Sequence, residues 1–94
     1  MKFVLHNRTY GYGMKHARPE RLTTAGALLD AVRELSGVVE RSPGVFYRRS
    51  RPFLHFHEDG EELFVDIKVD GEWVRNPASR VTEIDEVIRL VRSL

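Results

Sequence analysis

The clearest structural signal in the chain is the stretch PFLHFHEDGEELFVDIKV, residues 52–69. Apolar and polar residues alternate on both sides of the pair Asp59-Gly60. Alternation with a period of two is typical of half-buried β-strands. An Asp-Gly pair between two such runs is a strong hairpin signal, because a type I′ turn needs positive φ at both central residues. The stretch therefore predicts an antiparallel hairpin.

The alternation also predicts the register of this hairpin. With Asp59 and Gly60 as the loop, Phe56 faces Leu63 and His57 faces Glu62. A slip by one residue would set apolar residues of one strand against polar residues of the other. The expected core face carries Leu54, Phe56, Leu63, Val65 and Ile67.

Two further strands are expected beside the hairpin. The second Asp-Gly pair, Asp70-Gly71, predicts a turn that sets Lys68 against Trp73 and Asp66 against Arg75. Upstream, residues 45–48 are expected to pair with the first hairpin strand. In that pairing Val45 faces Phe56 and Tyr47 faces Leu54, which sends Phe46 and Arg48 to the face opposite the core.

Two helices are expected on either side of these strands. Apolar residues three and four apart between Leu22 and Leu35 predict a helix that is capped by Thr23 or Thr24 and ends at Gly37. A second apolar stripe runs from Val81 to Leu94, with Ser79 or Thr82 as the expected cap. The fold class is α+β: an antiparallel β-meander of three to four strands with two helices packed on one face, a two-layer sandwich.

The 94 residues predict a single domain, in which residues 1–21 form an N-terminal strand and a mobile or ligand-dependent loop. Hydrophobic residues make up 41% and charged residues 31%, with a net charge of +1, so overall charge favours no class of partner. The absence of cysteine excludes disulfides, thiolate metal sites and a cysteine nucleophile. No apolar run reaches membrane-spanning length, and we expect a cytoplasmic protein.

The face opposite the core has an unusual composition, and we call it the second face. It combines large aromatic rings with cations and histidines, a composition that indicates an interaction site or a covered surface. We expect self-association or a protein partner, with single-stranded nucleic acid stacked on the rings as the alternative and a small anionic or aromatic ligand as the third reading. The expected members are Phe46, Arg48, Phe53, His55, His57, Phe64, Asp66, Lys68, Trp73 and Arg75.

The pair His55 and His57 is the one candidate for metal chemistry. Both imidazoles lie on one side of a strand, and Asp66 on the neighbouring strand could add a carboxylate. The favoured interpretation is that these are partly exposed strand histidines beside carboxylates, because a metal site also needs supporting partners. His16 lies in a basic stretch that is interpreted as a solvated loop. Since no catalytic motif is present, we expect a binding module without a cofactor or catalytic activity.

Overall fold

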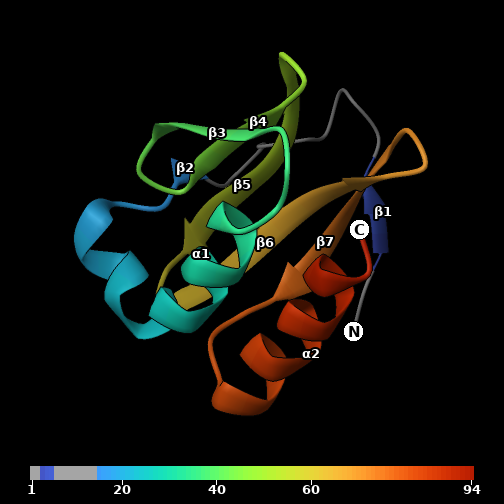
Figure 1. The fold of residues 1–94 in the computed structure, drawn as a ribbon. Coiled ribbons are helices and arrows are strands. Elements are labelled where there is room, and N and C mark those ends of the chain that lie inside the picture. Colours follow the sequence, from blue (N-terminus) through green and yellow to red (C-terminus); the bar gives the residue numbers. More distant parts are fainter. Residues whose placement is uncertain (1–2, 6–14) are drawn as a thin grey trace.

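The computed structural model describes residues 3–5 and 15–94. It shows an α+β domain in which a five-strand antiparallel meander is packed against two helical segments (Figure 1). The elements in chain order are β1 (Phe3–Leu5), β2 (Lys15–His16), the 3-10 helix η2 (Pro19–Ala25), α1 (Gly26–Arg33), β3 (Val38–Ser42), β4 (Val45–Arg48), β5 (Arg51–Asp59), β6 (Glu62–Val69), β7 (Glu72–Pro77) and α2 (Val81–Arg92). The predicted fold class is confirmed.

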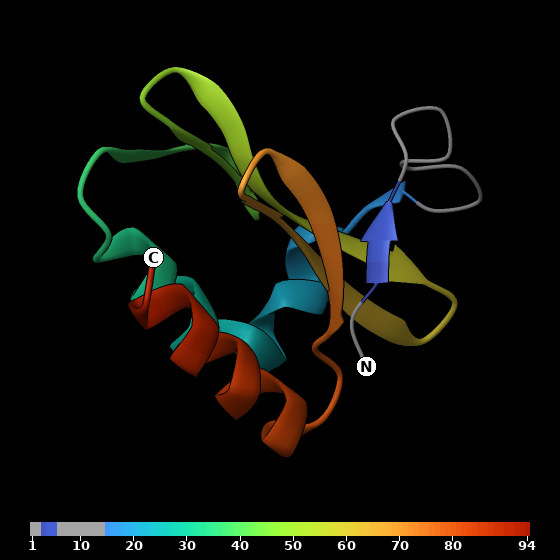
Figure 2. The same cartoon turned by 90° about the vertical axis from the view of Figure 1, so that its right-hand side faces the viewer.

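Strands β3 to β7 follow one another across the sheet in chain order. Two short pieces extend this meander: β1 pairs with β7, and β2 pairs with β5 next to the start of β4. Helices α1 and α2 lie together against one face of the sheet (Figure 2). The sheet thus has one face covered by helices and one face that is built from the polar positions of the strands.

The turn between β6 and β7 forms as the sequence predicts. Asp70 and Gly71 have φ angles of 51° and 81°, the positive pair that a type I′ turn requires. Lys68 pairs with Trp73 and Asp66 pairs with Arg75, so this register is confirmed.

The hairpin of β5 and β6 forms with a register two residues away from the predicted one. Asp59 pairs with Glu62, so Gly60 and Glu61 make the loop, and His57 faces Phe64 instead of Glu62. A shift of two residues leaves every side chain on its predicted face, because strand side chains alternate with a period of two. The predicted pairs are therefore wrong, while the predicted core face is retained.

The predicted pairing of β4 with β5 is wrong by one residue at Val45 and Phe46 and by two residues at Tyr47 and Arg48. Phe46 pairs with Leu54 and Val45 pairs with His55, and the register shifts between Phe46 and Tyr47. An odd shift exchanges the two faces. Phe46 consequently lies in the core and is fully buried, and it is not a member of the second face.

The core lies between the helices and the sheet. Its largest fully buried apolar side chains are Phe46, Phe56, Leu28, Leu54, Ile67, Val32, Val65, Val87 and Val91. The turn between β3 and β4 closes on this core at Gly44, which has a φ of 75°. A Cβ atom at that position would lie 3.1 Å from Leu22 Cδ1 and 3.2 Å from Phe56 Cβ, so a larger residue would be crowded there as well as strained by the positive φ.

Both helices begin differently from the prediction. The first begins as a 3-10 turn at Pro19, upstream of the expected threonine caps, with proline in its first turn where a missing N–H costs nothing. At the second, the carboxylate of Glu83 accepts hydrogen bonds from the backbone N–H groups of Ser79 and Arg80. Glu83 therefore satisfies two backbone N–H groups at the start of this helix. None of the helices in the described ranges is long and apolar enough to cross a membrane.

Candidate metal centre

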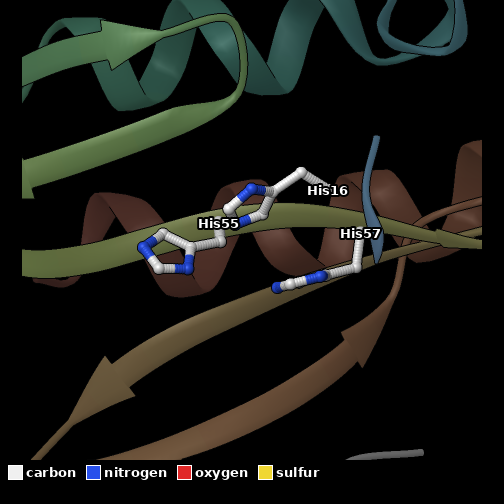
Figure 3. Close-up of side chains that lie close together, drawn as sticks. All are labelled: His16, His55 and His57. Atoms are coloured by element: carbon white, nitrogen blue, oxygen red, sulfur yellow. The ribbon is translucent and has the colours of Figure 1, made fainter. Parts of the chain in front are cut away.

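Three histidine side chains gather beside β5. His16, His55 and His57 each present a ring nitrogen, and these three nitrogens all lie within 4.8 Å of one another. The ring centroids are 5.3 Å apart for His16 and His55, 5.1 Å for His16 and His57, and 5.9 Å for His55 and His57. Figure 3 shows one nitrogen of each ring facing the space between the rings.

The cluster forms because two neighbouring strands each contribute to it. Alternation along β5 places His55 and His57 on the same face of the sheet. Strand β2 pairs antiparallel with the same strand and sets His16 directly beside His57. The sequence motif supplies two imidazoles, and the strand pairing supplies the third.

Hydrogen bonds from the two residues that follow β2, Ala17 and Arg18, hold the strand in this register. The backbone N–H of Ala17 donates to the carbonyl oxygen of Phe56 at 3.0 Å. The guanidinium of Arg18 donates to both carboxylate oxygens of Glu58, at 3.1 and 3.0 Å, and its backbone N–H donates to the same carboxylate at 2.8 Å. Glu58 is 2% exposed, so this carboxylate lies inside the protein and its charge is balanced there.

The cluster is closed on one side and open on the other. His57 is 2% exposed and His55 is 9% exposed, whereas His16 is an exposed residue. Burial, followed by the neighbouring His16 and His57, lowers the pKa of His55 from its ordinary value of 6.5 to about 4. His55 is therefore neutral at physiological pH, and one of its two ring nitrogens carries a lone pair that can bind a cation.

A buried ion pair lies behind the histidines. Asp66 Oδ2 is 3.4 Å from His57 Nε2. Both oxygens of the same carboxylate accept hydrogen bonds from Arg75, at 2.7 Å each. Asp66 is fully buried and Arg75 is 6% exposed, so the carboxylate is held firmly and is directed at the histidine.

The indole of Trp73 forms the wall of the cluster beside His55. The two ring centroids are 5.0 Å apart with an angle of 41° between the rings. The ammonium of Lys68 lies 5.2 Å from the indole centroid, on a side chain that is exposed. Trp73 is the only tryptophan of the chain, so its fluorescence reports on this region alone.

The predicted second-face residues are only partly brought together. His55, His57, Asp66, Trp73 and Arg75 form one connected group, and Phe53 is buried with the Arg48 guanidinium 5.4 Å from its ring centroid. Phe64 is half-buried, and the guanidinium of Arg75 lies 6.0 Å from its ring centroid. Phe46 belongs to the core. Most of these side chains are buried. No observation tests the expected docking of a partner on the second face, which stays a prediction.

Sequence reasoning missed His16 as a member of the cluster. It also treated Asp66 as a candidate ligand, whereas this carboxylate is engaged by Arg75 and lies behind His57. The pairing of β2 with β5 joins residues about 40 positions apart, and no local pattern signals such a contact. Comparison with protein-family models, with curated proteins and with solved structures finds no match to this chain.

Proposed function

We propose that this protein binds a divalent transition-metal ion through His16, His55 and His57. The observation that carries the proposal is the convergence of three imidazole nitrogens within 4.8 Å. In tetrahedral zinc sites the metal–nitrogen distance is about 2.0–2.1 Å, so ligand nitrogens lie roughly 3.4 Å apart. Side-chain rotations that bring the three rings slightly closer would complete the coordination.

The ligand set favours particular metals. Imidazole suits Zn²⁺, Cu²⁺, Ni²⁺ and Fe²⁺, while Mg²⁺ and Ca²⁺ prefer oxygen ligands. Three protein ligands leave a further coordination position, as in zinc sites that bind water or an external ligand. The exposed side of the cluster, at His16, is where that position would face solvent.

The carboxylate behind the cluster supports the same proposal. Metal-binding histidines usually donate their second ring N–H to a carboxylate, which fixes the tautomer and the ring orientation. With the proton of His57 on Nε2, facing Asp66, Nδ1 is the ring nitrogen that would bind the metal. Arg75 holds the Asp66 carboxylate in place for this role through two hydrogen bonds.

The protonation state of His55 favours binding at neutral pH. A metal ion must displace any proton from its ligands, which makes metal affinity dependent on pH. Because the pKa of His55 is about 4, no proton has to leave this ring at pH 7.

Quenching of Trp73 fluorescence by Co²⁺, Ni²⁺ or Cu²⁺ tests the proposal. The protein is first treated with a chelator and then titrated at pH 7.5 in a non-coordinating buffer, with Zn²⁺ added afterwards as a competitor. We expect saturation at one ion per chain, because Trp73 packs against His55. His16→Ala should weaken binding by about 100-fold or more, since loss of a supporting residue already costs roughly 10–100-fold.

Lys68→Met is the matched control for this titration. It alters the surroundings of the indole without removing a ligand, so metal affinity should be unchanged while the emission spectrum shifts. The proposal is rejected when the native protein shows no saturable quenching at micromolar metal, or when His16→Ala and His57→Ala bind as the native protein does.

A further inference from the structure

A second feature of the molecule is a basic pocket at the far end of β5. Its volume is about 380 Å³, within the range of roughly 300–1,000 Å³ that small-ligand sites occupy. It lies where the end of β4, the start of β5 and the end of β6 meet the turn before β7. Four cations line it, Arg48, Arg49, Arg51 and Lys68, together with the apolar side chains of Pro52 and Phe53.

None of these four cations forms an ion pair with a side-chain carboxylate of the described residues. Other arginines of the described residues do form such pairs, namely Arg18, Arg33, Arg75 and Arg80. Like charges that share one pocket repel each other, and an anion in the pocket would remove that repulsion. The pocket therefore has the charge distribution of an anion site.

The four cations differ in how firmly they are held. Arg48 donates to the carbonyl oxygens of Ser36 and Leu94, both at 3.2 Å, and lies over the ring of Phe53. This anchored side chain forms part of the pocket wall. The guanidinium groups of Arg49 and Arg51 form no hydrogen bond within the described residues, which leaves their N–H groups available to an anion.

The turn that carries Arg49 has an unusual composition. Arg49 and Ser50 have φ angles of 52° and 70°, the conformation that Asn-Gly or Asp-Gly adopts most readily. The chain uses Asp70-Gly71 at the equivalent turn between β6 and β7. Positive φ at a residue other than glycine costs of order 1–3 kcal/mol, and such positions cluster at ligand sites. The chain therefore has an arginine beside the pocket at a position where Asn or Asp would adopt the turn conformation more readily.

We propose that this pocket binds the phosphate group of a small phosphorylated ligand. Arginine recognises phosphate through two parallel N–H bonds, and Lys68 adds a compact charge on the opposite strand. Pro52 and Phe53 offer an apolar surface to the organic part of such a ligand. The site is separate from the three histidines and does not depend on a metal.

The charges around the pocket favour a small ligand over a nucleic acid. Nucleic-acid sites extend as a basic track that follows several phosphates. Here the cations converge on one pocket, the adjoining turn carries Asp70 and Glu72, and the whole chain has a net charge of only +1. Acidic groups at the rim would repel a continuing phosphate backbone.

Calorimetric titration with inorganic pyrophosphate tests this site. The buffer contains about 20 mM salt and EDTA, so that no metal on the histidines can hold the ligand. We expect saturable binding of one pyrophosphate per chain, weakened tenfold or more in the double variant Arg49→Asn with Ser50→Gly. That variant should melt at the same or a higher temperature, because Asn-Gly suits the turn, and the loss of binding would therefore not reflect unfolding.

Arg89→Gln is the charge-matched control. It removes one positive charge from the exposed surface of α2, at a residue that does not line the pocket, and should leave pyrophosphate affinity within about twofold. Absence of saturable binding, or an equal loss in Arg89→Gln, overturns the proposal. Binding of a ten-nucleotide oligo(dT) that exceeds pyrophosphate affinity and grows with oligonucleotide length also overturns it, in favour of a nucleic-acid site.

Discussion

Strand β5 sends Leu54 and Phe56 to one face of the sheet and His55 and His57 to the other. All four residues are buried, so the two faces do not divide into an inside and an outside. On the helix side, the strand meets aliphatic and aromatic side chains of the core. On the second face, its histidines meet an indole and a carboxylate that belongs to an ion pair.

This contrast between the two faces indicates where the molecule tolerates amino-acid substitution. Apolar burial is non-directional and roughly proportional to area, so a conservative substitution on the helix side loses a small part of it. A buried charge depends on one partner in one geometry, and removal of that partner leaves an uncompensated charge. The second face should therefore respond far more sharply to substitution, pH and metal than the core does.

The largest effect is expected from Asp66→Ala. It leaves the guanidinium of Arg75 buried without its carboxylate, and should lower the free energy of unfolding by about 3–5 kcal/mol. Urea denaturation followed by circular dichroism measures this loss. A comparable loss from an apolar change would require truncation of a large core side chain.

The double variant Asp66→Leu with Arg75→Met distinguishes two origins of that loss. When both charges are replaced by apolar groups of similar size, stability is often regained. We expect the double variant to recover most of the loss of Asp66→Ala. A double variant as unstable as the single one would show that the ion pair itself stabilises the native fold.

A second, smaller effect is expected from pH in chelator-treated protein. His55 has a pKa of about 4 in the native state and an ordinary value of 6.5, so the unfolded chain binds more protons between these values. Stability should be complete above pH 6.5 and fall as the pH drops toward 4, by about 3 kcal/mol from this group. Denaturation curves at half-unit pH steps measure this slope.

His55→Gln separates this contribution from that of the carboxylates. The variant has no titrating group at this position, so its stability should change less between pH 6.5 and 4 than that of the native protein. Equal slopes for the two proteins would show that His55 does not contribute to the acid sensitivity.

The smallest effect is expected on the helix side, from Ile67→Val. This residue is fully buried beside Asp66 in sequence but faces the core, and loss of one methylene should cost about 0.5–1.5 kcal/mol. The cost should be the same at pH 4.5 and pH 7.5, and metal affinity should be unchanged. A cost that varies with pH or metal would show that the two faces are coupled.

The sequence predicts the helix-covered face well, because alternation fixes which residues share a face even where the pairing is wrong. The loop of β5 and β6 lies one residue further along the chain than predicted, which shifts the pairing by two residues. Contacts from a distant segment accompany this loop, since Arg21 donates to the carbonyl oxygens of Gly60 and Glu61. The register of β4 is wrong because Arg49 and Ser50 alone make the turn to β5, and because the register then shifts again between Phe46 and Tyr47. Nothing in the local pattern signals such a bulge.

The candidate site was predictable only in part. His55 and His57 follow from alternation, and the partnership of Asp66 with Arg75 follows from the Asp-Gly turn. The burial of that pair does not follow, because the same cross-strand pair on a solvated sheet would contribute little. His16 could not be placed at all, because its neighbours come from a strand that lies far along the chain.

Strand β2 is only two residues long, yet it carries one of the three imidazoles. A metal ion shared by His16 and His55 would join two points about 40 residues apart in the chain. Such an ion acts as a reversible cross-link, which restricts the unfolded chain much as a disulfide does, in a protein that has no cysteine. The concentration of available metal would then determine how stably β2 is attached to β5.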